Sequence, residues 1–195
     1  MNLPELCAQA MELAAPDKLD LSRCVYGLHK RTGEMVGTPQ YYQLLAGLIL
    51  TTQTPEPQVL EVGTYRGGAA MAMATAGASV LTIDIVSKPG PAHPQLHRII
   101  GDSCAPVTQA LVSTQLSAPI DLLFIDSHHT AESVEQNLAA YLPFQPRLIV
   151  LDDIHLNPSM EALWSTIAKQ MPFEAFDASV LVSRGCGFGV LRARK

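Results

Sequence analysis

Three aspartates and two histidines closely follow apolar runs of the chain. Asp126 comes directly after Leu-Leu-Phe-Ile, and Asp152 and Asp153 come directly after Leu-Ile-Val-Leu. Carboxylates at adjacent strand ends repel one another unless a cation lies between them, and oxygen ligands favour a hard ion such as Mg²⁺. His129 follows Asp126 by three residues, and a histidine can titrate near neutral pH. We therefore expect magnesium at Asp126, Asp152 and Asp153, with His129 as the functional histidine beside it and His128 in reserve.

The same aspartates have a second interpretation. Aspartate is a favoured N-cap residue, and Asp126 stands shortly before a predicted helix that begins near Thr130. The aspartates would then cap the helices that follow them and would hold no metal. Both interpretations stay open at the level of the sequence.

Glycines and further carboxylates gather where other apolar runs end. Glycines let the backbone approach a ligand closely, and the helix that follows them offers free N–H groups. Glu61 precedes the first glycine, where a carboxylate repels pyrophosphate but suits a cationic ligand. Asp84 suits a bidentate contact with ribose hydroxyls, and Asp102 or Ser103 can reach an adenine edge. The glycine-rich turn comprises Glu61, Val62, Gly63, Thr64, Tyr65, Arg66, Gly67 and Gly68.

These residues depend on strands and helices that alternate along the chain. Short, continuously apolar runs predict strands buried on both faces, here 59–62, 80–83, 96–100, 122–125 and 148–151. Helices are predicted at 67–76, 105–115, 130–141 and 158–170, and two closing strands at 173–176 and 187–192. This alternation predicts a doubly wound α/β sheet, and such sheets bind ligands beyond the carboxyl ends of their strands.

The first part of the chain has a different pattern. Helices are predicted at 3–14 and 40–50, with a glycine-containing segment between them. We expect residues 1–57 to form a helical cover on the sheet and residues 58–195 to form the cofactor-binding α/β core. Both parts belong to one domain of residues 1–195, since the length is that of a single domain.

Composition excludes several classes of protein. The 195 residues are 48% hydrophobic and 16% charged, with a formal net charge of −5, so the chain is globular and would on average be repelled by nucleic acid. The four cysteines are far apart and form no CxxC pair, which favours reduced thiols and a cytoplasmic location. The N-terminal segment lacks the pattern of a signal peptide, and no apolar run is long enough to span a membrane.

In this order, the motifs resemble those of the class I S-adenosylmethionine-dependent methyltransferases. The narrower resemblance is to the metal-dependent small-molecule O-methyltransferases: the catechol and caffeoyl-CoA families and their bacterial macrolide-sugar and cephalosporin-pathway relatives. VLEVGTYRGG resembles their first cofactor motif, LTID the ribose-binding strand end, and GDS the adenine contact. FIDSHHT and LIVLDD resemble the two metal-bearing motifs, and MVGTPQYYQLL (35–45) a segment that closes the site. The resemblance covers about residues 34–192.

The resemblance implies a Rossmann-like, mostly parallel, seven-stranded sheet with helices on both faces. It implies methyl transfer from S-adenosyl-L-methionine to a hydroxyl of a small molecule. Magnesium would bind the oxygen of this hydroxyl and lower the pKa of the hydroxyl. His129 would be the general base, and a homodimer is expected on this ground alone. The cofactor-binding residues implied are Glu61, Gly63, Thr64, Tyr65, Gly67, Asp84, Asp102, Ser103 and Asp126.

The chain departs from the family pattern in three places. A lysine is common where His129 stands, and Asp-Asn is common where Asp152 and Asp153 stand. A histidine at this position is closer to the bacterial natural-product branch. The usual Pro-Gly-Gly turn before the fifth strand is replaced by residues 143–147. The identity of the base and of the acceptor therefore stays open.

Two other functions compete with the metal-dependent enzyme. One is a metal-independent methyltransferase in which the aspartates are caps and His129 works alone. The other is a cofactor-binding module without catalysis that acts through a partner. A nicotinamide dehydrogenase is disfavoured, because the glycine spacing differs from the GxGxxG pattern of pyrophosphate-binding turns.

Overall fold

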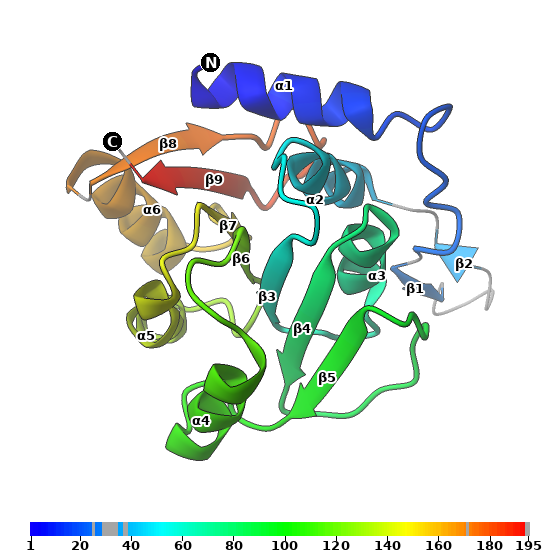
Figure 1. The fold of residues 1–195 in the computed structure, drawn as a ribbon. Helices are drawn as coiled ribbons and strands as arrows, with labels where there is room; N and C mark the ends of the chain where they lie inside the picture. Colours follow the sequence, from blue (N-terminus) through cyan, green and yellow to red (C-terminus); the bar gives the residue numbers. More distant parts are fainter. Residues whose placement is uncertain (25, 29–34, 37–38, 171, 194–195) are drawn as a thin grey trace.

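A seven-stranded sheet forms the centre of the described chain. The computed structural model describes residues 1–24, 26–28, 35–36, 39–170 and 172–193. In these ranges the strands of the sheet are β3 (Gln58–Val62), β4 (Ser79–Asp84), β5 (Leu96–Ile100), β6 (Leu122–Ile125), β7 (Leu148–Asp152), β8 (Phe173–Asp177) and β9 (Phe188–Ala193). Their order is β5-β4-β3-β6-β7-β9-β8 (Figure 1), and β9 is antiparallel to both of its neighbours. The predicted Rossmann-like, mostly parallel, seven-stranded sheet is confirmed.

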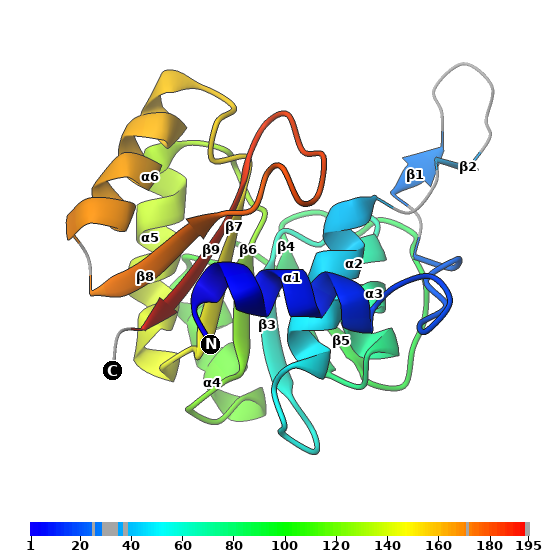
Figure 2. The ribbon, with the colours of Figure 1, turned by 90° about the horizontal axis from the view of Figure 1, so that it is seen from above.

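Helices cover both faces of the sheet because its strands are apolar on both sides. Val59 packs with α1 (Leu3–Leu13), α2 (Gln40–Leu50) and α3 (Gly68–Thr75), whereas its neighbour Leu60 packs toward the opposite face. That second face carries α4 (Pro106–Gln115), α5 (Ala131–Tyr141) and α6 (Pro158–Gln170), so the molecule has three layers (Figure 2). No helix in the described part of the chain has the length and apolar character needed to cross a membrane.

The N-terminal helices lie against each other and against the sheet. Asn2 caps α1 through a reciprocal capping box with Glu5, which satisfies backbone donors at the start of the helix. Gly47 of α2 faces the backbone of Ala10 so closely that a Cβ there would lie 2.0 Å from the Ala10 carbonyl oxygen. The sequence did not predict the small antiparallel pair β1 (Gly27–Leu28) and β2 (Met35–Val36) that precedes α2.

The reversed direction of β9 determines where its preceding loop lies. Because β9 is antiparallel to β7, Phe188 at its start pairs with Asp152 at the end of β7. The connection 178–187 between β8 and β9 therefore reaches the edge at which the parallel strands have their carboxyl ends. This edge is where doubly wound sheets bind ligands.

The close approach of α1 and α2 makes a testable prediction. Replacing glycine by alanine within a helix usually stabilises the helix by about 1 kcal/mol. Gly47→Ala should instead destabilise the protein, because its methyl group would push α1 and α2 apart. The expected loss is about 1–3 kcal/mol of unfolding free energy, measured by urea denaturation. Gly185→Ala is the control, since a Cβ at Gly185 meets no atom within 4 Å; equal stability of both variants would contradict this packing.

Candidate functional site

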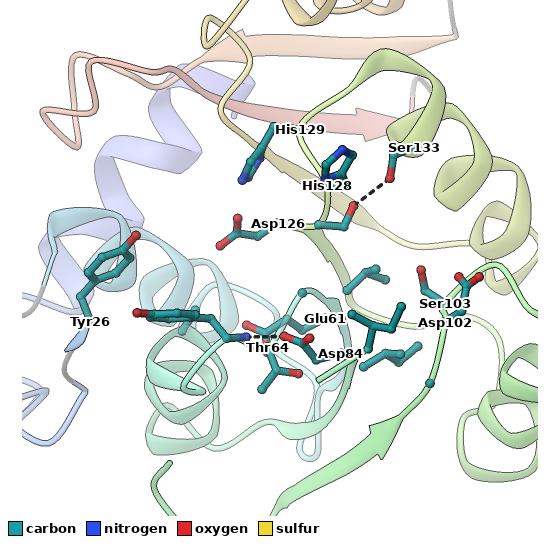
Figure 3. A pocket seen from close by; sticks show the side chains of 18 of the residues that line it. Tyr26, Glu61, Thr64, Asp84, Asp102, Ser103, Asp126, His128, His129 and Ser133 are labelled. Atoms are coloured by element: carbon teal, nitrogen blue, oxygen red, sulfur yellow. Dashed lines mark hydrogen bonds between the residues drawn. The ribbon is translucent and has the colours of Figure 1, made fainter. Parts of the chain in front are cut away.

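A pocket of about 470 Å³ opens at the carboxyl edge of the sheet, between the ends of β3, β4 and β6. This is the point where the strand order reverses around β3. Its volume lies in the range of small-molecule and cofactor sites. The structure brings most of the predicted site residues together there (Figure 3); those that line it are Glu61, Gly63, Thr64, Tyr65, Asp84, Asp102, Ser103, Asp126 and His129.

Glu61 is fully buried at the pocket and only half satisfied. Its Oε2 accepts a hydrogen bond from the Thr82 hydroxyl, whose oxygen lies 2.5 Å from that of Thr64. Its Oε1 has no hydrogen-bond partner among the described residues. Burial raises the pKa of this carboxyl to about 8, against the hydrogen bond from Thr82. A buried carboxyl oxygen without a partner favours a polar ligand, and a positive charge on that ligand would favour the ionised form of Glu61.

Asp84 ends β4 with its carboxylate held by backbone donors. Oδ2 accepts from the Tyr65 N–H at 2.7 Å, and Oδ1 accepts from the Val86 N–H at 2.9 Å. Tyr65 has a left-handed backbone, with φ of 47°, which is uncommon for a residue with a side chain and recurs at ligand-binding turns. The carboxylate is thus fixed before a ligand arrives, with lone pairs left for two adjacent hydroxyls.

Two glycines shape the turn after β3. Gly63 has φ of +98°, and a Cβ there would lie 1.8 Å from the Asp126 carbonyl oxygen. Only glycine allows the ends of β3 and β6 to approach so closely at the pocket. Gly67, at φ +80°, is the N-cap of α3 and does not line the pocket. Its predicted cofactor contact would therefore have to act through the turn that it shapes.

Asp102 and Ser103 lie after β5 on the far side of the pocket. Asp102 accepts from the Cys104 N–H at 2.9 Å, and the Ser103 hydroxyl donates to Asn137 on α5 at 2.7 Å. The Tyr141 hydroxyl donates to the Ser103 carbonyl at 2.6 Å. The segment is thereby tied to α5, and it presents polar atoms where the sequence predicts an adenine contact.

Asp126 and His129 stand together at the mouth after β6. The Asp126 carboxyl lies inside the pocket, and burial together with the nearby Asp152 raises its pKa well above the ordinary range. The His129 ring lies 3.3 Å from Asp153, measured from Nδ1 to Oδ2. His128 also lines the pocket and has the more exposed side chain of the two histidines. An aspartate at Nδ1 orients an imidazole for proton transfer through its other nitrogen.

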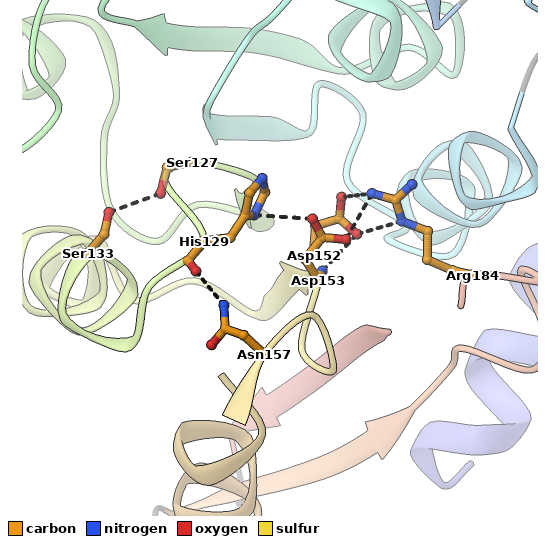
Figure 4. Close-up of polar contacts among 7 residues, drawn as sticks. All are labelled: Ser127, His129, Ser133, Asp152, Asp153, Asn157 and Arg184. Carbon is orange, nitrogen blue, oxygen red and sulfur yellow. Dashed lines mark hydrogen bonds and ion pairs between the residues drawn. The ribbon is translucent and has the colours of Figure 1, made fainter. Parts of the chain in front are cut away.

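The predicted magnesium ligands do not form a metal site in this structure. Arg184 donates two hydrogen bonds to Asp152, from Nε to Oδ1 at 3.0 Å and from Nη2 to Oδ2 at 2.5 Å. Its Nη2 also donates to Asp153 Oδ1 at 3.1 Å (Figure 4). Within the described ranges, no group of three His, Cys, Asp or Glu side chains is arranged to hold a metal ion. The magnesium site thus stays a prediction, and in this structure Arg184 occupies two of its three carboxylates.

The alternative that these aspartates cap the next helices is wrong. Thr130 caps α5 by accepting from the Ser133 N–H, and the side chain of Asn157 accepts from the N–H groups of Ser159 and Met160 at the start of α6. The aspartates instead face the pocket or Arg184. Burial raises the pKa of Asp152, opposed by its hydrogen bonds to Arg184.

Several residues at or beside the pocket were not named as site residues from the sequence. Tyr26, Tyr41 and Tyr42 line the pocket, and Arg184 lies with its guanidinium carbon 4.8 Å from the centre of the Tyr41 ring. The two adjacent tyrosines fall in the segment 35–45 that was expected to close the site, of which residues 37 and 38 lie outside the described residues. The two expected closing strands predicted a loop before β9, but the antiparallel pairing of β9 with β7 that brings Arg184 to this edge is seen only in the structure.

Comparisons with known proteins give a match at the level of structure only. No protein-family model matches the chain, and no curated protein matches its sequence. Among solved structures, the SAH-bound methyltransferase PaMTH1 of Podospora anserina has a TM-score of 0.57 and 12% identity, over 100% of this chain and 90% of that one. Magnesium protoporphyrin IX methyltransferase ChlM of Synechocystis, with bound SAM, has 0.55 and 17%, over 80% and 79%.

A third similar structure is MycE, a methyltransferase from the mycinamycin biosynthetic pathway, in complex with Mg, SAH and mycinamycin VI. It has a TM-score of 0.51 and 15% identity, over 71% of this chain and 45% of that one. The chain thus spans less than half the length of that enzyme. At these identities the likeness shows the fold: the chain has the Rossmann-like fold of the class I SAM-dependent methyltransferases.

The raised pKa of Glu61 predicts how stability depends on pH. A carboxyl with a higher pKa in the folded than in the unfolded chain binds its proton more tightly when folded, so stability falls as pH rises from the ordinary 4.5 toward about 8. The melting temperature of the ligand-free protein should therefore fall between about pH 5 and about pH 8.5. Glu61→Gln should flatten this fall, measured by thermal denaturation, while the exposed Glu132→Gln should not; parallel curves for both variants would contradict the buried carboxyl.

Proposed function

We propose that the protein transfers a methyl group from S-adenosyl-L-methionine to a hydroxyl oxygen of a small molecule. The observation that carries this proposal is one pocket at the reversal of strand order that holds both the fixed Asp84 carboxylate and the half-satisfied Glu61 carboxylate. When bound, the cofactor supplies a methyl group on a positively charged sulfonium. The fold of the similar methyltransferases supports the same class of reaction.

The residues of the pocket fit this cofactor in their chemistry. Asp84 would accept the two ribose hydroxyls, and Glu61 would meet the ammonium end with the oxygen that has no partner among the described residues. Gly63 lets the ligand approach the backbone between β3 and β6. Asp102 and Ser103 would contact the adenine side, since they lie beyond β5 in the same pocket. Opposite charges and matched donors make this a specific site.

The acceptor would bind at the mouth, beside His129. In the transfer, the bond from sulfur to the methyl carbon breaks with its electron pair going to sulfur, and the acceptor oxygen forms the new bond. His129 would take the hydroxyl proton on Nε2, because Nδ1 faces Asp153. The tyrosines Tyr26 and Tyr41 line the same pocket and would help to exclude water from the reacting atoms.

No step of this proposal passes through a metal ion. Magnesium was expected at Asp126, Asp152 and Asp153, but Arg184 engages the last two. The structure of the methyltransferase from the mycinamycin pathway contains Mg, which is a property of that protein. The proposed transfer depends on positioning of the two reactants and on His129 as base, as in the metal-independent alternative.

Cofactor binding tests the first half of the proposal. Titration calorimetry with S-adenosylhomocysteine should show micromolar binding, and Asp84→Asn should weaken it about tenfold or more, because a charge-assisted contact with the ribose is lost. Asp17→Asn, an exposed carboxylate outside the pocket, should leave the dissociation constant unchanged. A wild-type protein that does not bind S-adenosylhomocysteine would remove the proposed function altogether.

Substitution of His129 tests the second half of the proposal, that this histidine is the general base. Methyl-labelled cofactor would be incubated with a panel of small phenols and sugar alcohols, and the first substrate that is methylated would be used for kinetics. His129→Gln should lower kcat about a hundredfold or more while S-adenosylhomocysteine binds as in the wild type. His128→Gln is the matched control at the adjacent position. A large loss in His128→Gln with little change in His129→Gln would assign the base to His128.

A further inference from the structure

Within the part of the chain that the structure describes, Arg184 is the only arginine or lysine that contacts Asp152 or Asp153. Asp152 is buried and receives both Nε and Nη2 of the guanidinium, in the forked geometry that matches a carboxylate. Nη2 also reaches Asp153. Figure 4 shows the guanidinium directed at the two carboxylates, with His129 on the opposite side of Asp153.

The loop that carries Arg184 is held in place by backbone hydrogen bonds. The N–H of Asp153 donates to the Gly187 carbonyl at 3.0 Å, and that of His155 donates to the Cys186 carbonyl at 2.7 Å. Within the loop, the Arg184 N–H donates to the Ser179 carbonyl at 3.0 Å. Arg184 therefore contacts the carboxylates from a loop fastened to the end of β7, and its ring contact with Tyr41 adds a further support.

The oxygens that a metal would need are already engaged. Both oxygens of Asp152 bind Arg184, Oδ1 of Asp153 binds Arg184, and Oδ2 of Asp153 lies against His129. A divalent cation would have to displace the guanidinium from a fork that satisfies a buried carboxylate, or lie beside it and be repelled. Of the three predicted ligands, Asp126 alone lacks a side-chain partner among the described residues, and a hard cation held by one carboxylate needs further oxygen ligands.

We propose that Arg184 supplies the positive charge that a divalent cation was expected to supply, so that methyl transfer by this protein is independent of metal. This inference rests on the proposed function. Arg184 acts as a positioning residue: it compensates Asp152 and fixes Asp153, and Asp153 in turn orients the His129 ring toward the pocket. The consequence is a latent metal site, in which removal of the guanidinium leaves carboxylates free to bind a cation.

The first experiment measures cation binding directly, with Mn²⁺ as the probe. Mn²⁺ would be titrated into the purified wild-type protein, and free Mn²⁺ followed by electron paramagnetic resonance, while S-adenosylhomocysteine binding is measured by calorimetry in Mg²⁺ and in EDTA. We expect no specific Mn²⁺ binding below millimolar concentrations and the same S-adenosylhomocysteine affinity in both buffers. Specific Mn²⁺ binding at micromolar concentrations by the wild type would overturn the proposal.

The second experiment removes the guanidinium. Arg184→Gln should gain Mn²⁺ affinity by about tenfold or more, whereas Arg184→Lys should not, because it keeps the positive charge. Arg147→Gln is the matched control, since it breaks another contact of an arginine with a buried aspartate, Asp121, at the opposite end of the strands. A folded Arg184→Gln variant without gained Mn²⁺ affinity would overturn the proposal.

The two proposals fail in different ways. A wild-type protein that does not bind S-adenosylhomocysteine would refute the proposed function, whatever its behaviour toward Mn²⁺. If S-adenosylhomocysteine binds and the wild type also holds Mn²⁺ tightly, only the role of Arg184 is refuted. Should Arg184→Gln not fold, the wild-type titration and the Arg184→Lys variant decide the question, since Mn²⁺ binding by either one contradicts the proposal.

Discussion

The need to compensate carboxylates that converge on one edge of the sheet governs the architecture of the site. Parallel strands bring Asp126 and Asp152 to the same edge, where burial opposes the ionised form of each. Arg184 compensates the buried charge of Asp152 through a forked ion pair. Ions taken out of water need close geometry and full hydrogen bonding to be tolerated, and the loop from β8 to β9 provides both.

Two acidic side chains at the same edge of the sheet are held in different ways. Asp84 is fixed by backbone N–H groups, and no ion pair with a described side chain takes part in holding it. Glu61 is buried with one oxygen unsatisfied, which costs stability in the absence of a ligand. Such a cost is typical of binding sites, where the group that is poorly satisfied in the free protein is satisfied in the complex. The pocket therefore contains one carboxylate that backbone donors fix and one carboxyl group with an oxygen that has no partner among the described residues.

Much of the fold could be predicted because strand and helix signals are local. The apolar runs around Leu60, Leu123 and Ile149 formed strands as expected, and the structure places these three strands next to one another in the sheet. The tiny pair β1–β2 was not predicted, because two-residue strands carry no periodic pattern. Asp84, the last residue of β4, and His129, four residues after the end of β6, were predicted at the pocket because strand ends converge in a doubly wound sheet.

By itself, the sequence determined the order of the elements, the edge of the sheet at which the pocket lies and most of the acidic residues of the pocket, because each follows from short-range pattern and from the general rule for parallel sheets. Only the tertiary structure decided what neutralises Asp152 and Asp153. Arg184 lies more than thirty residues away in the chain, in a segment without a pattern of its own. Its position depends on the antiparallel pairing of β9 with β7, two strands far apart in the chain that meet only when the whole sheet packs.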